Sequence, residues 1–244
     1  MHATQYFQIV RKLMARVEET QVAAIDKAAE VIADTIAKGG VLHIFGTGHS
    51  HMLGEELFYR AGGLVPVNMI FEPGLMLHQG AAKSTRLEKL PGYAKIILEE
   101  AGTRAGEPII ILSNSGINAV PVEMALEAKA QGLVVIALSS LAMATAAQPR
   151  HSSGKKLFEV ADICLDNCVI PGDAVLELPG LAQKVGPIST LLGALILNVL
   201  IIRVIERLIE AGQVPPVFMS SNLPGGAEYN EKVMARYRQH IRGL

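Results

Sequence analysis

Short apolar runs dominate this sequence, and most of them lead into a turn of glycine or small polar residues and then into a helical stretch. Runs rich in Val, Ile and Leu, without regular polar alternation, are typical of strands that are buried on both faces. Their alternation with helices favours a parallel sheet with right-handed crossovers. The sequence therefore predicts an α/β fold, a three-layer αβα sandwich around a five-stranded parallel sheet. The expected strands cover 41–45, 65–71, 109–112, 133–138 and 163–165.

Helical periodicity fills much of the remaining chain. Apolar residues recur at helical spacing from 6 to 37, and we expect a break near Thr20 because this stretch is long for one helix. The arrangement predicts one domain over 1–244, with an N-terminal helical segment at 1–40 and C-terminal helices at 187–244. The other expected helices run from the first strand to about 61 and over 84–101, 119–131 and 187–211.

Charge and composition exclude several classes of partner. The formal net charge is −1, so no basic surface is expected to attract nucleic acid or an anionic membrane. The apolar stretch 188–202 falls short of the roughly 20 residues that span a bilayer, and we expect it to be buried in the core or between subunits. Cys164 and Cys168 are too few for a disulfide framework, and the N-terminus lacks the features of a signal peptide. We predict a cytoplasmic protein.

Two loops after expected strands carry the residues that suggest a ligand. The first is Gly46-Thr47-Gly48-His49-Ser50-His51, and the second is Ser113-Asn114-Ser115-Gly116-Ile117-Asn118. Glycine lets a backbone approach an anion, and hydroxyls and the N–H groups of the following helix supply donors. The first loop matches neither G-x-G-x-x-G nor the P-loop, which argues against a dinucleotide or nucleotide site. Because parallel strands end at one edge, the two loops together predict a site for a phosphate group.

These motifs resemble a known family. LSNSGINAVPVEMALEAKAQG and FGTGHSHMLGEELFYRAGG resemble the two signatures of the sugar isomerase (SIS) domain family, and RHSSGKKLFEVADICLDN and VGPISTLLGALILN resemble its single-domain bacterial members. The resemblance covers nearly the whole chain. It implies a fold related to flavodoxin and Rossmann folds, a small-molecule sugar phosphate as ligand, and a homodimer or homotetramer with shared sites. The substrate-binding residues expected from the loops and this resemblance are Gly48, Ser50, His51, Ser113, Asn114, Ser115, Gly116, Asn118, Ser189 and Thr190.

Three functions are compatible with such a site. An aldose–ketose isomerase needs a base that moves a proton between adjacent carbons through an enediol, and an acid that opens the sugar ring. An etherase-type lyase acting on N-acetylmuramic acid 6-phosphate needs similar groups, and a non-catalytic phosphosugar sensor needs none. We favour the isomerase, with Glu88, Glu72, Glu56 and His49 as candidate catalytic residues. The resemblance does not predict a phosphoheptose isomerase, because the late-helix Gln and His of those enzymes are replaced by Leu191 and Val199.

A metal site is not expected. His51 and Glu55 are spaced i, i+4 on one expected helix, but no third ligand is evident from the sequence. We predict no metal and no cofactor.

Overall fold

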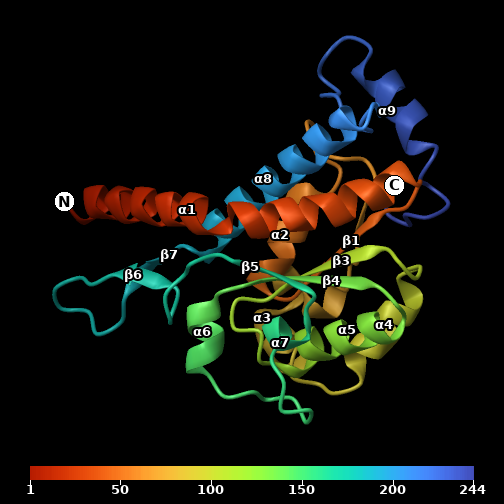
Figure 1. Ribbon diagram of the computed structural model, residues 1–244. Helices are drawn as coiled ribbons and strands as arrows, with labels where there is room; N and C mark the ends of the chain where they lie inside the picture. The colour runs from red at the N-terminus through yellow and green to blue at the C-terminus, as the bar shows by residue number, and fades with distance from the viewer.

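The computed structural model describes residues 1–244 and contains the predicted five-stranded parallel sheet (Figure 1). The strand order is β2-β1-β3-β4-β5, and every neighbouring pair is parallel. The predicted fold class is therefore confirmed. The strands are β1 (Leu42–Gly46), β2 (Val67–Met69), β3 (Pro108–Leu112), β4 (Val134–Ser139) and β5 (Ile163–Asp166).

Helices cover both faces of this sheet, which gives the three layers seen in Figure 1. The helices α1 (His2–Ala37), α2 (His49–Leu57) and α8 (Ser189–Glu210) cover one face. The other face carries α4 (Tyr93–Glu100), α5 (Ala119–Ala130) and α7 (Leu157–Val160). The short helices α3 (Ala81–Leu87) and α6 (Leu141–Ala146) follow β2 and β4.

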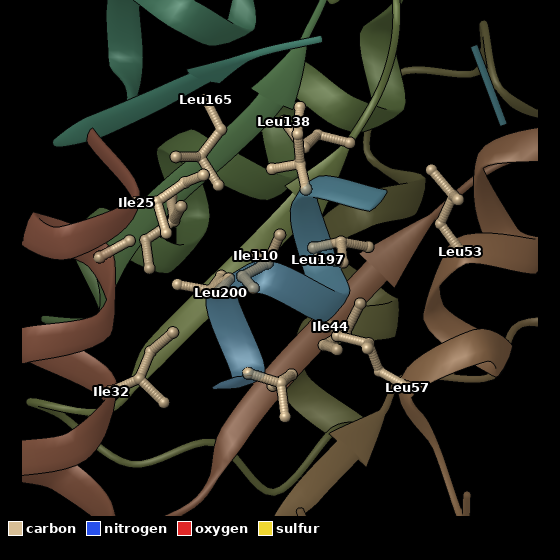
Figure 2. Packing of buried hydrophobic residues seen from close by; sticks show 14 of the residues in the cluster. Ile25, Ile32, Ile44, Leu53, Leu57, Ile110, Leu138, Leu165, Leu197 and Leu200 are labelled. Atoms are coloured by element: carbon tan, nitrogen blue, oxygen red, sulfur yellow. The ribbon is translucent and has the colours of Figure 1, made fainter. Parts of the chain in front are cut away.

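Alternating side chains of the buried strands fill two separate cores. In β3, Ile110 and Leu112 point to the layer of α1, α2 and α8, whereas Ile109 and Ile111 point to the layer of α4 and α5. Figure 2 shows the first core, where leucines and isoleucines of β1, β3, β4 and β5 meet those of the three covering helices. Each such side chain contributes roughly 1.5–3 kcal/mol on burial. This packing fixes the strand ends, and with them the loops that follow.

Several element boundaries differ from the sequence prediction. Helix α1 is unbroken at Thr20, whose hydroxyl donates to the Arg16 carbonyl at 2.7 Å within the helix. The helix expected over 84–101 is instead two, because Pro91 and Gly92, with φ +82°, separate α3 from α4. Helix α2 ends at Leu57, earlier than 61, and Tyr59 then adopts a left-handed conformation with φ +52°.

The chain also forms elements that periodicity did not predict. Two 3₁₀ turns, η1 (Pro73–Leu75) and η2 (Leu77–Gln79), follow β2. An antiparallel hairpin of β6 (Ala174–Leu176) and β7 (Val185–Pro187) lies against the start of α1, where the Tyr6 hydroxyl donates to the Pro187 carbonyl at 2.8 Å. The C-terminal part contains α9 (Gly226–Met234). None of the helices, α8 included, has the length and apolar character needed to cross a membrane.

Candidate functional site

The carboxyl ends of β1 and β3 lie side by side in the sheet, and the loops that follow them lead into α2 and α5. The strand order reverses between these two strands, because β2 lies on the outer side of β1. Ligands of open α/β sheets bind at such a switch point. The fold therefore places both predicted loops where a ligand site is expected.

The loop after β1 is held by its backbone. Gly48 adopts φ +56°, and its N–H donates to the Leu75 carbonyl at 3.0 Å. A Cβ on Gly46 would lie only 2.7 Å from the Ser50 carbonyl oxygen, so this position has no room for a side chain. The hydroxyls of Thr47 and Ser50 make no hydrogen bond within the protein and remain available to a ligand.

The loop after β3 is held from the adjacent strand ends. The buried Ser139 hydroxyl, at the end of β4, donates to the Ser113 carbonyl at 2.7 Å. The Ser113 hydroxyl accepts from the Gly116 N–H at 3.2 Å, which closes the loop on itself. Gly116 has φ +58°, and a Cβ there would lie 3.0 Å from the Leu157 Cβ. This position favours glycine for both reasons.

Unpaired donors gather in this second loop, at the N-terminus of α5. The two serines that flank Asn114 each contribute a free hydroxyl donor. The Ser115 hydroxyl has no partner in the protein, and the Ser113 hydroxyl accepts a hydrogen bond but does not donate one. Together with the positive end of the α5 dipole, this set suits a phosphate group. The backbone N–H groups that make no hydrogen bond within the protein are those of Asn114, Ser115, Ile117, Asn118 and Ala119.

Supporting residues after β4 and β5 were missed by sequence reasoning. The side chain of Asn167 is fully buried and donates to the Asn114 amide oxygen at 2.7 Å. The Ser140 N–H donates to the Asn114 carbonyl at 2.9 Å. Small polar residues directly after a buried strand were the only sequence signal for these positions. They hold the loop so that its free donors keep a fixed arrangement.

The three candidate glutamates lie in different surroundings. Glu88 ends α3, is half-buried, and its carboxylate makes no hydrogen bond or ion pair in the protein. Its backbone carbonyl accepts from the Val120 N–H at 3.0 Å, so Glu88 lies beside the start of α5. Glu88 is therefore a candidate glutamate with a free carboxylate whose backbone contacts the helix that follows the second loop.

The other two carboxylates are already engaged. Glu72 accepts from the Gly74 N–H at 2.8 Å, and burial together with a hydrogen bond to Glu72 raises the pKa of Tyr93 to about 12. Glu56 pairs with Arg60 at 2.9 Å and accepts from the Asn198 amide at 3.2 Å, on the side of α2 that faces α8. Neither is poised to act as a free base.

The two histidines of the first loop also differ. His49 is exposed at the start of α2 and makes no hydrogen bond or ion pair within the protein. His51 is buried and packs edge-on against Phe71, and burial lowers the pKa of its imidazole. Its Nε2 lies 3.2 Å from Glu55 Oε1. His49 is the histidine that a ligand can reach.

Ser189 and Thr190 open α8, as expected. Asp173 caps this helix end, because one carboxylate oxygen accepts from the N–H groups of Ile188 and Ser189 at 3.0 and 2.8 Å. The other oxygen accepts from the Ser189 hydroxyl at 2.7 Å. The Ser189 donors are thus taken by Asp173, whereas the Thr190 hydroxyl makes no hydrogen bond in the protein.

A cluster of potential metal ligands lies at the opposite edge of the sheet, near the amino ends of β1 and β3. His43, Glu107 and His240 bring three ligand atoms within 4.8 Å of one another. The Asn68 amide donates to both the Ala101 carbonyl and His43 Nδ1, so His43 carries its proton on Nε2 and donates to Glu107 at 2.8 Å. This proton occupies the lone pair that a metal would need, so the cluster is a hydrogen-bonded network.

Comparison with known proteins agrees with this description. The SIS domain family profile matches residues 5–140. The UPF0309 protein of Caldanaerobacter subterraneus is 44% identical over 242 residues, which cover 98% of each chain. The UPF0309 protein of Shouchella clausii is 40% identical over 241 residues, again 98% of each chain.

Solved structures share the fold at low sequence identity. A phosphoheptose isomerase from Francisella tularensis superposes with a TM-score of 0.54 at 17% identity, covering 84% of this chain and 97% of that one. The Vibrio vulnificus NanR protein, complexed with ManNAc-6P, superposes with a TM-score of 0.54 at 14% identity, covering 98% of this chain and 69% of NanR. The profile match and the UPF0309 relatives show that this chain belongs to the SIS domain family.

Proposed function

We propose that this protein binds a sugar phosphate and isomerises it between aldose and ketose forms. The observation that carries the proposal is the loop Ser113–Asn118, which presents four unpaired backbone N–H groups and a free serine hydroxyl beside the unpaired N–H of Ala119, the first residue of α5. A phosphate group offers several acceptor oxygens to such a set without requiring a lysine. The fold relatives include a phosphoheptose isomerase and a regulator complexed with ManNAc-6P, which supports this ligand class.

Glu88 is the base in this proposal, and His49 is the acid that opens the ring. The Glu88 carboxylate is unpaired and the Glu88 backbone contacts the start of α5, whereas the carboxylates of Glu72 and Glu56 are held by neighbouring groups. With phosphate bound in the loop, Glu88 moves a proton between C1 and C2 through an enediol. An exposed histidine that a ligand can reach suits this role, because its ring nitrogens can donate and accept protons.

Assembly into a homodimer or homotetramer forms part of the proposal. Helices α1 and α8 form an apolar groove of about 290 Å³, lined by Met14, Val22 and Leu195 among others. The exposed side chains of Val199 and Ile202 extend this apolar surface along α8. A second copy of the chain would remove this surface from water.

Exchange of the C2 proton tests the reaction. Wild-type protein is incubated with hexose and amino-sugar phosphates in D2O, and the C2 proton signal is followed by NMR. The isomerase proposal predicts loss of this signal for at least one phosphorylated sugar. Binding of a sugar phosphate without proton exchange would favour a non-catalytic sensor. Release of lactate from N-acetylmuramic acid 6-phosphate would identify an etherase-type lyase.

A further inference from the structure

Asn118 occupies the N-cap position of α5, yet its side chain does not cap the helix. An N-cap asparagine ordinarily accepts a hydrogen bond from the N–H of the second or third helical residue. Here the second residue, Val120, donates its N–H to the Glu88 carbonyl at 3.0 Å. The third residue, Pro121, has no N–H. Both usual partners of the Asn118 amide oxygen are therefore absent.

Arg150 supplies the missing partner from a distant segment. Its Nη1 donates to Asn118 Oδ1 at 3.0 Å, and its backbone N–H donates to the Ile117 carbonyl at 3.0 Å. The segment that follows Arg150 is fastened at two further points. The next residue, His151, lies 3.3 Å from Glu123 of α5, and the Leu157 N–H donates to the Gly116 carbonyl at 2.8 Å. Arg150 is thus held beside the second loop.

This contact determines which end of the Asn118 amide faces Arg150. A guanidinium has only donors, so it binds the amide oxygen and cannot bind the NH2 group. Asn118 Nδ2 makes no hydrogen bond within the protein, and it belongs to a nearly buried residue whose own backbone N–H is also unpaired. The free end of the side chain is therefore a donor, in a loop whose other free groups are donors.

We propose that Arg150 is a positioning residue of the anion site: it turns the Asn118 amide so that Nδ2 donates to the phosphate group of the ligand. This inference rests on the proposed function, because it assigns a donor and its orienting partner to the same site. Arg150 acts through Asn118 here and not through direct contact with the phosphate. The pair adds a side-chain donor to a loop that otherwise relies on backbone N–H groups and serine hydroxyls.

A double-mutant cycle tests the pair, with inorganic phosphate as the probe and calorimetric titration as the readout. Arg150→Ala and Asn118→Ala are each expected to weaken phosphate binding by about tenfold, the loss of one charge-assisted hydrogen bond. The double variant is expected to bind no more weakly than either single variant. Asn118→Asp keeps an oxygen for Arg150 but replaces the NH2 with an anionic oxygen, so it should weaken binding more than Asn118→Ala.

Lys155→Ala is the matched control, because it removes the same charge from the same exposed segment and its side chain makes no hydrogen bond. It should leave phosphate affinity unchanged. A further loss on adding Arg150→Ala to Asn118→Ala would overturn the inference, since Arg150 would then act by its own charge. Unchanged affinity in Arg150→Ala would overturn it while leaving the proposed function intact. Absence of phosphate binding by the wild type would contradict both.

Discussion

The Glu88 carbonyl and the Val120 N–H form a 3.0 Å hydrogen bond that joins the end of α3 to the first turn of α5. This bond satisfies an N–H group that a helix start otherwise leaves unpaired. It also places the backbone of Glu88 at the helix end that follows the loop Ser113–Asn118. The proposed base and the proposed phosphate site are therefore linked through one backbone contact.

Replacing Glu88 separates catalysis from binding. Glu88→Gln keeps the backbone contact but removes the base, so we expect proton exchange at C2 to fall by about 10²- to 10⁴-fold while phosphate affinity is kept. NMR exchange and calorimetric titration measure the two effects. Glu56→Gln is the comparison, because Glu56 is paired with Arg60 and should affect exchange far less. Equal losses in the two variants would contradict the assignment of Glu88.

Replacing two serines at the second loop should separate stability from binding: Ser139→Ala should lower stability, and Ser115→Ala should lower phosphate affinity. Ser139→Ala removes a buried donor and leaves the Ser113 carbonyl unpaired, so urea unfolding should show a loss of about 1–3 kcal/mol. Ser115→Ala removes a hydroxyl with no partner in the protein, so stability should change by less than about 0.5 kcal/mol while phosphate affinity falls. A large destabilisation by Ser115→Ala would show that its hydroxyl is structural.

The free energy of unfolding should decrease on acidification. Burial lowers the pKa of His51 and of His240 below the usual value near 6.5. As the pH falls through the usual histidine value, the unfolded chain therefore binds more protons than the folded one. The stability that the two buried histidines contribute is fully present above that pH and is lost as the pH falls below it. Urea unfolding at about pH 7.5 and about pH 5.5 measures the difference. His240→Asn should reduce it, and an unchanged difference would argue against a role for His240.

The apolar surface of α8 predicts the effect of a charge on assembly. Val199 is partly exposed and lines the groove between α1 and α8. Val199→Glu should convert the proposed dimer or tetramer into monomers, as measured by light scattering, because a desolvated carboxylate in an interface is unfavourable. Glu210→Gln, at the exposed end of α8, is the control that should leave assembly unchanged. A monomeric wild type would contradict this part of the proposal.

The sequence predicted the strands of the sheet more accurately than the limits of the helices. Buried runs such as Ile109–Leu112 are local signals, and all five expected strands are present. Helix limits were less accurate, because Thr20 bonds within α1 instead of breaking it and Pro91-Gly92 divides α3 from α4. The hairpin of β6 and β7 was missed, since its strands are too short to show alternation.

The candidate site residues divide in the same way, into those in local motifs and those joined by contacts between distant segments. Glycines and serines of the two loops form local motifs, so they could be found from the chain alone. Contacts such as Ser139 with Ser113 or Arg150 with Asn118 join residues 26 and 32 positions apart, and periodicity carries no information about them. The contacts of Glu72 with Tyr93 and of Glu56 with Asn198 likewise depend on tertiary packing.

The central claim is that the loop Ser113–Asn118 binds the phosphate of a sugar phosphate. The most direct test is a thermal-shift measurement of wild type and Ser115→Ala with matched pairs of phosphorylated and unphosphorylated sugars. A ligand that binds the native state raises the melting temperature once it exceeds its dissociation constant. We predict an increase with phosphorylated sugars only, and a smaller one in Ser115→Ala. Equal shifts with the unphosphorylated sugars, or no shift with any phosphorylated one, would contradict the claim.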